Sequence, residues 1–323
     1  MTSIVTGLIR KTAFSLLGIL ACVGLSRSQI AGSAGAFARM GSGARGMGMG
    51  NAMTAVNFGD IQTYYNPSLG AFAEYRSAGL TFGILSLDRS LNFVNYTQPI
   101  HPTAGVSFGI INAGVKNIDG RDGDGEKTGD LSTFENQFYL AFSNRVSDRV
   151  SLGVAVKLYY SKLYDQVTST TVGFDLGFSA QLTDLLSIGG AIQDLNSKYT
   201  WDTKAIYDQN GKTTTDKFPT LRRIAAALRL PSNLGLISAE FENSSQQTNV
   251  FRAGAEYYII EYLTLRAGID RIDPSGDATG AKPSLGFTIR NSFIGLTPAV
   301  TYAYVFESFA PQGMHIITLS TAF

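Results

Sequence analysis

Apolar and polar side chains alternate along most of the chain beyond residue 75. In SLGVAVKLYYS, residues 151–161, every second residue from Leu152 to Tyr160 is apolar, and small or polar residues stand between them. The segment TVGFDLGFSA, residues 171–180, repeats this pattern. Successive side chains of a β-strand point to opposite sides, so the alternation predicts strands with one apolar side and one polar or cramped side.

Turn residues divide this region into about fourteen strand-like segments. The segments span 76–86, 89–98, 103–115, 133–145, 150–162, 169–181, 185–195, 221–230, 234–242, 249–258, 263–271, 281–290, 297–307 and 314–323. Short turns alternate with longer polar connections, of which the longest are 116–132 and 194–220. This arrangement is typical of outer-membrane barrels. We therefore predict an all-β protein, a transmembrane antiparallel β-barrel of about fourteen strands.

A soluble β-sandwich is the competing architecture, because its strands alternate as well. Beyond residue 220 the side opposite the apolar one carries charged residues, which both architectures accommodate. These residues are Arg223, Arg229, Glu240, Glu242, Arg252, Glu256, Arg266, Asp270 and Arg290. In a barrel we expect them to form ion pairs with one another inside a narrow lumen, and a gate or a ligand site is the alternative role.

The last segment, MHIITLSTAF at residues 314–323, favours the barrel. It alternates and ends on Phe323, which resembles the terminal aromatic residue by which the barrel-assembly machinery recognises outer-membrane proteins. His315 and Thr321 depart from a fully apolar outward side. We interpret Phe323 as an outer-membrane assembly signal and the apolar side of this strand as facing the lipid of the outer membrane.

The first 28 residues have the pattern of a secretory signal peptide. Arg10 and Lys11 precede the apolar stretch TAFSLLGILACVGL, and Ser26 to Ser28 form a small-x-small exit. A short anchor helix is one alternative, and a lipoprotein signal at Cys22 is another, although Leu20 is bulky for that motif. Cys22 is the only cysteine of the chain, so disulfides and cysteine-based metal sites are excluded. No later apolar run reaches the ~20 residues of a transmembrane helix.

Residues 29–74 do not alternate and are rich in glycine. Glycine allows close backbone packing, so we predict that this segment folds inside the barrel as an N-terminal lumenal plug. A disordered periplasmic tail is the alternative, but apolar residues such as Phe37, Met47 and Phe58 have no use in an exposed linker. The predicted organisation is a signal peptide at 1–28, a plug at 29–74 and a barrel at 75–323.

Part of this segment resembles a known family. GARGMGMGNAMTAV at residues 43–56, Asp60, and YYNPSLGAF at residues 64–72 are similar to the N-terminal signature of the PorV/PorQ branch of the FadL-like outer-membrane proteins. The matching residues are Gly43, Arg45, Met49, Gly50, Asp60, Asn66 and Pro67. Ser68 replaces the usual alanine, and a single Asp60 stands where relatives often carry two acidic residues. The resemblance implies a fourteen-stranded barrel preceded by a plug.

The resemblance also implies two classes of function. A PorV/PorQ-type protein is a component of type IX secretion that holds or hands over secreted proteins at the cell surface, with secreted proteins or other secretion subunits as partners. A protein of the wider FadL group is a channel for small hydrophobic molecules. A hydrophobic route needs an apolar lining, and the charged residues beyond residue 220 therefore favour the secretion role.

Both termini of an even-stranded outer-membrane barrel lie in the periplasm, so the connections 116–132, 194–220 and 272–280 are expected at the cell surface. Trp201 and Tyr207 in the second of them are candidate anchors for a folded partner. A loop that merely caps the barrel mouth is the alternative.

Other chemistry is weakly supported. The sequence GVSFG places Ser107 in a Gly-x-Ser-x-Gly pattern, but in the middle of a predicted strand, and the chain has only two histidines, so we expect no enzyme and no cofactor. Asp122, Asp124 and Glu126 either gather around Ca²⁺ or belong to a solvated turn, which is the expectation, and no metal site is predicted. The net charge of +1 offers no basic surface for nucleic acid.

Overall fold

The computed structural model describes residues 32–273, 280–292 and 295–323. The predicted signal peptide, including Cys22, lies outside the described residues, as does most of the predicted external connection 272–280.

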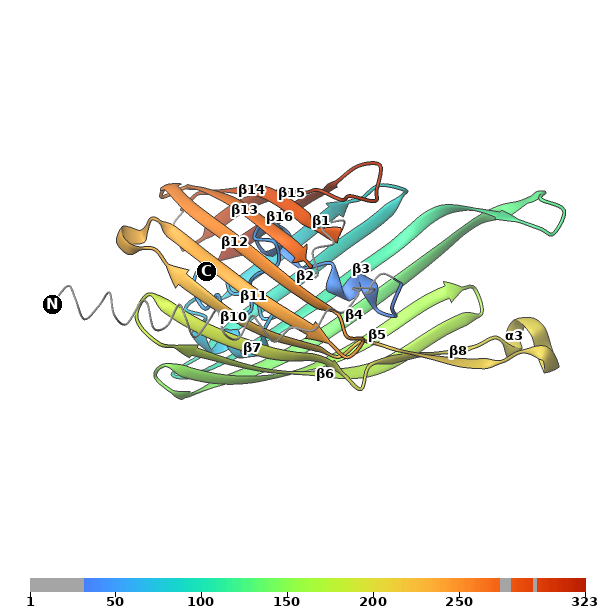
Figure 1. The fold of residues 1–323 in the computed structure, drawn as a ribbon, viewed down its shortest axis with the longest axis horizontal. Coiled ribbons are helices and arrows are strands. Elements are labelled where there is room, and N and C mark those ends of the chain that lie inside the picture. Colours follow the sequence, from blue (N-terminus) through green and yellow to red (C-terminus); the bar gives the residue numbers. More distant parts are fainter. Residues whose placement is uncertain (1–31, 274–279, 293–294) are drawn as a thin grey trace.

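Fourteen antiparallel strands form a closed ring, as the alternation predicts (Figure 1). The strands of the ring are β1 (Ser77–Ile84), β2 (Arg89–Ile100), β3 (Ala104–Arg121), β4 (Lys127–Ser147), β5 (Val150–Tyr164), β6 (Val167–Gln181), β7 (Leu186–Leu195), β10 (Leu221–Arg229), β11 (Gly235–Ser244), β12 (Asn249–Ile260), β13 (Leu263–Ile272), β14 (Lys282–Arg290), β15 (Thr297–Val305) and β16 (Met314–Ala322). Pairing of β1 with β16, from Ser77 opposite Ala322 to Ile84 opposite His315, closes the ring. Closure leaves no unpaired edge between the first and last strands.

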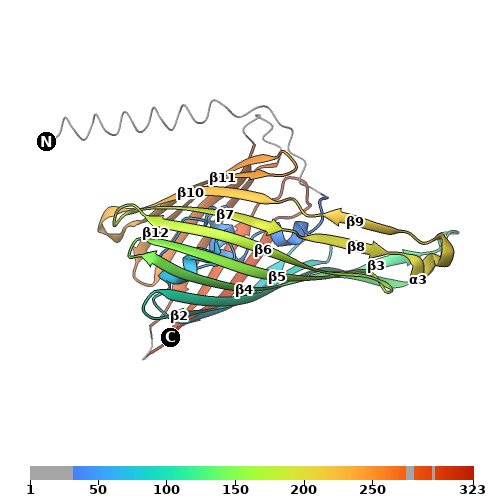
Figure 2. The same cartoon turned by 90° about the horizontal axis from the view of Figure 1, so that it is seen from below.

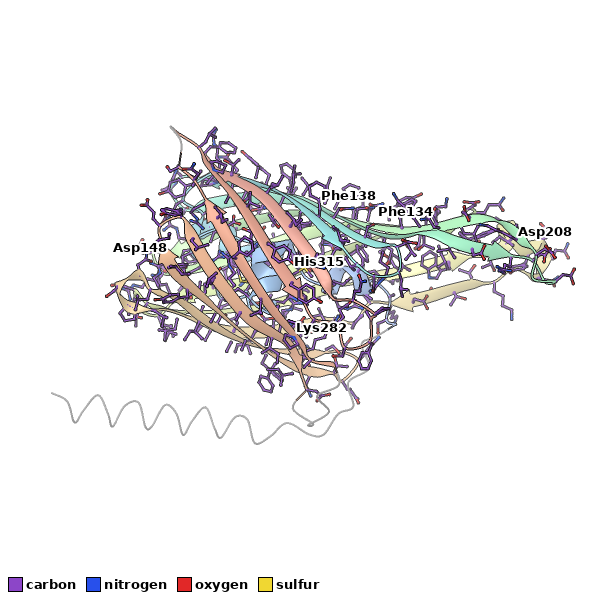
Figure 3. The ribbon with its side chains drawn as sticks, turned by 90° about the horizontal axis from the view of Figure 1, so that it is seen from above. Phe134, Phe138, Asp148, Asp208, Lys282 and His315 are labelled. Atoms are coloured by element: carbon purple, nitrogen blue, oxygen red, sulfur yellow. The ribbon has the colours of Figure 1, made fainter. Side chains whose placement is uncertain are left out.

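The two sides of each strand differ as expected. In β5, Leu152 and Val154 are exposed on the outside, whereas Ser151 and Ala155 are buried inside. The same alternation gives the whole ring an apolar outer surface and a packed interior. Figure 3 shows side chains covering the outside of the ring, with Phe138 and His315 among those labelled.

Short turns lie at one end of the ring and long hairpins at the other (Figures 1 and 2). We call these the short-turn end and the hairpin end. Figure 3 labels one residue near each: Asp148, in the turn between β4 and β5, and Asp208, at the tip of the hairpin that follows β7. The ring begins and finishes at the short-turn end, since Ser77 pairs with Ala322 there.

The connection predicted at 116–132 is mostly strand. β3 continues to Arg121 and β4 begins at Lys127, so only a tight turn separates them. Apart from the paired Ile118 and Leu131, the residues of this part are polar or glycine, so the alternation that marks a strand in the sequence is missing. In the turn, Asp122 Oδ1 accepts hydrogen bonds from the backbone N–H groups of Asp124 and Glu126, at 3.0 and 2.9 Å.

The connection predicted at 194–220 forms a second hairpin (Figure 2). It consists of β8 (Lys198–Asp202), the single-turn helix α3 (Lys204–Tyr207), the 3₁₀ turn η3 (Asp208–Asn210) and β9 (Thr213–Lys217). A further 3₁₀ turn, η4 (Pro231–Asn233), connects β10 to β11 at the short-turn end.

Residues 32–76 run inside the ring (Figures 1 and 2), and we call them the lumenal segment. The segment contains η1 (Ala36–Arg39), α2 (Gly43–Gly48) and η2 (Pro67–Phe72). Helix α2 packs against β13 to β16, and η2 packs against β2 to β6. Within the described part of the chain, no helix has the length and apolarity needed to cross a membrane.

Candidate functional site

Glycines of the strands allow the lumenal segment to lie directly on the barrel wall. A Cβ atom added at Gly268 would lie 2.2 Å from Gly50 N, and one added at Gly254 would lie 2.3 Å from Met49 O. Gly50 itself has φ +60°, a conformation that glycine adopts without strain. Comparable contacts with the lumenal segment occur at Gly105, Gly153, Gly177 and Gly189. Gly105 thus makes room for η2, and its neighbour Ser107 is buried, donating a hydrogen bond to Thr97 Oγ1.

The residues that carry the family resemblance hold the lumenal segment in place. The Arg45 guanidinium donates from Nε and Nη2 to the two carboxylate oxygens of Glu256, at 2.8 and 2.9 Å, and from Nη1 to the backbone oxygen of Asp60 at 2.6 Å. Asn66 accepts from Ser68 N at the start of η2, where Pro67 fixes φ. The Asn66 amide also donates to Thr54 O and to Phe178 O on β6.

Charged residues inside the ring gather in three buried clusters on β5 to β13. In the first, Arg45 and Arg266 share Glu256. The second contains Arg223, Glu240, Glu242, Arg252 and Asp270. In the third, the Lys157 ammonium lies 2.7 Å from Asp175 and 3.0 Å from Asp194. Seven of the nine residues expected to pair are therefore in these ion pairs, whereas Arg229 lies over the ring of Phe58 and Arg290 is exposed at the end of β14. The lumenal segment takes part through Arg45 and through Asn51, which donates to Asp270.

The opposite side of the lumen carries no charge. The inward positions of β1, β15 and β16 contain only small, hydroxylated or aliphatic residues, and we call these three inward faces the charge-free wall. These residues are Ser77, Gly79, Thr81, Gly83, Thr297, Ala299, Thr301, Ala303, Val305, Met314, Ile316, Thr318, Ser320 and Ala322. The lumen thus has a charged side and an uncharged side. The sequence argument for a charged lumen beyond residue 220 was incomplete, because β15 and β16 also lie beyond that point.

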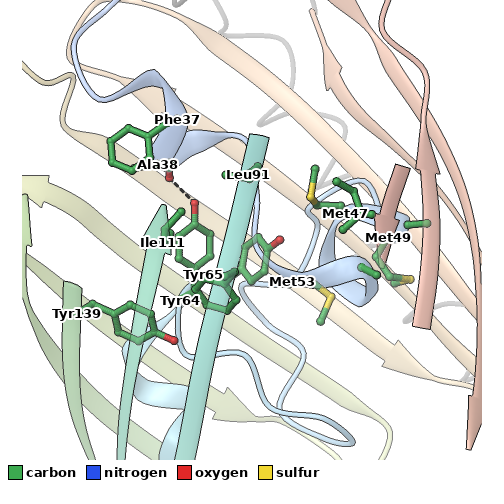
Figure 4. Packing of buried hydrophobic residues seen from close by; sticks show 14 of the residues in the cluster. Phe37, Ala38, Met47, Met49, Met53, Tyr64, Tyr65, Leu91, Ile111 and Tyr139 are labelled. Atoms are coloured by element: carbon green, nitrogen blue, oxygen red, sulfur yellow. Dashed lines mark hydrogen bonds between the residues drawn. The ribbon is translucent and has the colours of Figure 1, made fainter. Parts of the chain in front are cut away.

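Aromatic and aliphatic side chains extend the uncharged side onto β2 to β4 (Figure 4). Phe93 packs against Tyr139 and Tyr64, with ring centroids 6.2 and 6.0 Å apart. Leu91 and Ile111 complete this surface. Tyr64 donates a hydrogen bond to Ala38 O, and burial raises the pKa of its hydroxyl to about 12, so the ring stays neutral. Sequence reasoning missed this surface, although the alternating inward positions in β2 and β3 contained the signal.

Two cavities lie at the ends of the lumen. At the hairpin end, a cavity of about 940 Å³ is bounded by residues 32–36, β4, β5 and the β8–β9 hairpin. At the short-turn end, a cavity of about 550 Å³ lies between the lumenal segment, residues 290, 292 and 295–299, and the end of β16. Both volumes fall within the range of small-molecule sites.

The structure does not join the two predicted anchor residues into one surface. Trp201 is partly buried, packs on Tyr199 with ring centroids 5.0 Å apart, and donates from Nε1 to Asp216 at 2.9 Å. It is therefore part of the hairpin's own packing. Tyr207 lies in α3 near the hairpin tip and is 60% exposed. Phe323 donates its backbone N–H to Arg76 O and leaves its ring half exposed.

A closed antiparallel ring with an apolar outside and a packed interior defines an outer-membrane β-barrel protein. No protein-family model and no curated protein matches the sequence. Solved structures do match, and they show that the ring has the fold of FadL-type outer-membrane channels.

The Pseudomonas putida toluene transporter TodX superposes with a TM-score of 0.61 at 13% identity, covering 87% of this chain and 96% of that one. The CymD monoaromatic hydrocarbon channel superposes with a TM-score of 0.61 at 14% identity, covering 88% of this chain and 97% of that one. A Pseudomonas aeruginosa FadL homologue superposes with a TM-score of 0.60 at 14% identity, covering 87% of this chain and 98% of that one. The chain is thus an outer-membrane protein with a FadL-type barrel. Outer-membrane barrels place short turns in the periplasm, so we expect the hairpin end at the cell exterior.

Proposed function

We propose that this protein is a FadL-like channel through which small hydrophobic molecules cross the outer membrane. The observation that carries the proposal is the charge-free wall, which continues into the apolar surface of Leu91, Phe93 and Ile111. An uncharged solute passing along this side meets no charged inward residue on β1, β15 or β16 and contacts side chains that gain from apolar contact. Two proteins with a similar fold, a toluene transporter and a monoaromatic hydrocarbon channel, support the same class of solute.

The attachment of the lumenal segment differs between the two sides. On the charged side it is held by buried ion pairs such as Arg45 with Glu256. Toward the charge-free wall, α2 makes one hydrogen bond, from Ala44 N to Thr318 Oγ1 at 2.8 Å, and otherwise packs through small side chains. Separation at the charge-free wall breaks far fewer strong interactions than separation at the ion-pair clusters. We therefore infer that the route opens between α2 and this wall.

The test is uptake of radiolabelled toluene by Gram-negative host cells that express the chain. Ile316 is fully buried in the charge-free wall, so Ile316→Glu places a carboxylate on the proposed route. We expect uptake above the empty-vector level to fall about tenfold or more, since an unpaired buried charge repels an apolar solute. Ile316→Val is the matched control and should keep uptake. The amount of heat-modifiable folded barrel is measured for each variant, and only variants present at wild-type levels are compared. Wild-type uptake no greater than the empty vector refutes the channel.

A role in type IX secretion is the second candidate. It is favoured by the resemblance of residues 43–72 to PorV/PorQ proteins and by the two hairpins that extend past the ring. Tyr207, exposed near one hairpin tip, is the residue to test. If Tyr207→Ala lowers the secreted proteins captured at the surface while toluene uptake is unchanged, the secretion role is favoured. Trp201→Ala is a poor probe, because it removes a side chain that packs within the hairpin.

A further inference from the structure

The hairpin of β8 and β9 extends past the ring at the hairpin end (Figure 2). On one side, β8 lies beside β6, where Thr200 N donates to Ser169 Oγ at 2.9 Å. On the other side, β9 has β8 as its only paired strand within the described part of the chain. Along the described residues, the far edge of β9 therefore faces no other strand.

Hydrogen bonds that flank β9 show which of its backbone groups point to this edge. Thr203 N donates to Lys212 O at 3.1 Å, and Phe218 N donates to Ser197 O at 3.0 Å. Because the backbone groups of an antiparallel strand point alternately to its two sides, the even-numbered residues of β9 bond to β8 and the odd-numbered ones point away. The odd-numbered residues are Thr213, Thr215 and Lys217, and we call their N–H and C=O groups the free edge. No described residue forms a hydrogen bond with these groups.

A second exposed strand edge at the hairpin end is protected against pairing, whereas β9 is not. Beyond Lys116, β3 has β4 as its only paired strand among the described residues. This edge begins with a register shift around Asn117, which has φ +56°, and it carries the ion pair of Asp119 with Arg121. Bulges and charges prevent edge-to-edge pairing. The pairing of β9 has no register shift, and residues 213–215 are threonines, which are uncharged and favour strands.

The free edge borders the cavity at the hairpin end. Thr215, Asp216 and Lys217 line this cavity together with Ser33 and Gln246, which hydrogen-bond to each other at 2.6 Å. The volume of about 940 Å³ leaves space beside β9 for an extended segment of polypeptide.

The side chains of β9 define the chemistry of a segment that pairs with it. Residues directly opposite each other in an antiparallel pair lie on the same face with neighbouring Cβ atoms. A basic residue therefore fits opposite Asp216, an acidic residue fits opposite Lys217, and β-branched residues fit opposite the three threonines. Written in its own direction, the complementary segment is acidic, then basic, then β-branched at three positions.

We propose that the free edge of β9 binds an extended segment of a partner protein as an added antiparallel strand. Backbone hydrogen bonds to Thr213, Thr215 and Lys217 hold the segment, and the side chains of Asp216 and Lys217 select its sequence. The site lies at the hairpin end, which we expect at the cell exterior, and it does not depend on the channel function.

Binding is tested with the purified full chain in lipid nanodiscs and a fluorescent peptide whose central residues are Glu-Lys-Val-Thr-Val. We expect a rise in fluorescence anisotropy and at least tenfold slower hydrogen exchange at the amides of Thr213, Thr215 and Lys217. The amides of Thr214 and Asp216 point to β8 and serve as the internal reference. Unchanged exchange at the three free-edge amides overturns strand addition.

A second peptide tests the predicted sequence preference. Its central residues are Lys-Glu-Val-Thr-Val, so it has the same composition but sets like charges opposite Asp216 and Lys217. We expect it to bind at least fivefold more weakly. Equal affinity of the two peptides overturns the preference.

The variant Thr215→Pro tests the free edge itself. It removes an N–H group that points away from β8, and proline is tolerated at such an edge position. We expect peptide affinity to fall at least tenfold while the amides of Thr214 and Asp216 keep their protection. Thr215→Val keeps the N–H group and should bind like the wild type. Binding that survives Thr215→Pro overturns the proposal. Protection of the free edge without peptide that increases with protein concentration shows pairing with a second copy of this chain and overturns the partner protein.

Discussion

Single residues decide how closely the lumenal segment lies on the barrel wall. At Gly268 the wall and the backbone of Met49 and Gly50 are so close that even a methyl group has no room. At Glu256 one carboxylate serves two guanidinium groups, one from the lumenal segment and one from the wall. Each kind of contact predicts a measurable loss when it is removed.

Replacing Gly268 by alanine should destabilise the protein by about 1–3 kcal/mol, because the added Cβ forces the lumenal segment and β13 apart. The measurement is urea unfolding of the protein in lipid vesicles, followed by heat-modifiable migration. Gly123→Ala is the matched control, since an added Cβ there meets nothing within 4 Å. Equal urea midpoints for Gly268→Ala and Gly123→Ala would show that the close approach at Gly268 does not contribute to stability.

Replacing Glu256 by glutamine should cost about 3–5 kcal/mol, since it leaves Arg45 and Arg266 buried without their shared counter-charge. The same unfolding measurement applies. Glu126→Gln, at an exposed turn, removes one negative charge without touching a buried pair and should change little. A loss in Glu256→Gln no larger than in that control contradicts the assignment of Glu256 as the anchor of the lumenal segment.

At the scale of elements, ion pairs hold the connection between β15 and β16 across the hairpin end of the charge-free wall. Glu307 in this connection accepts hydrogen bonds from Lys282 of β14 at 2.8 Å and from Arg89 of β2 at 3.1 Å. These two strands lie on either side of β15, β16 and β1. The pair of contacts therefore spans the charge-free wall.

The ion pairs of Glu307 with Lys282 and Arg89 should weaken in acid. Burial tends to raise the pKa of the Glu307 carboxyl, but hydrogen bonding to Lys282 and the charges of Lys282 and Arg89 outweigh it, so its pKa lies below the ordinary value of 4.5. A lowered pKa means that the stabilisation is complete above the ordinary pKa and is lost as the pH falls through the lowered one. Hydrogen-exchange protection of the Phe306 amide, which donates to Pro283 O, should therefore fall below about pH 4. In Glu307→Gln this pH dependence should vanish, and its persistence would exclude Glu307 as the titrating group.

At the scale of the whole molecule, the proposed route depends on movement between α2 and the charge-free wall. A Cβ atom on Gly48 would lie 3.4 Å from the Cβ of Ala303 on β15, close to the separation found in disulfides. The double variant Gly48→Cys with Ala303→Cys should therefore form a disulfide that joins the two. We expect oxidation to abolish toluene uptake and reduction to restore it. Each single-cysteine variant is the control, and uptake that survives quantitative crosslinking contradicts opening at this wall.

The number of strands in the ring, their inward and outward sides and the apolar outer surface could be predicted from the sequence, which also carries the resemblance of residues 43–72 to a family signature. These features are readable because alternation along a strand and turn residues between strands are local properties. The same method missed the extensions of β3 and β4 at 116–121 and 127–132, where too few apolar residues stand in the sequence to mark a strand.

Which inward side chains meet could not be predicted from the sequence, because it depends on contacts between distant strands. Arg45 and Glu256 are 211 positions apart, and β1 joins β15 and β16 in one wall only because the ring closes. The wall glycines that receive the lumenal segment are spread over six strands and have no shared spacing. Periodicity states which way a side chain points, but the closure of the ring and the path of the lumenal segment determine what it faces, and both arise from contacts between distant parts of the chain.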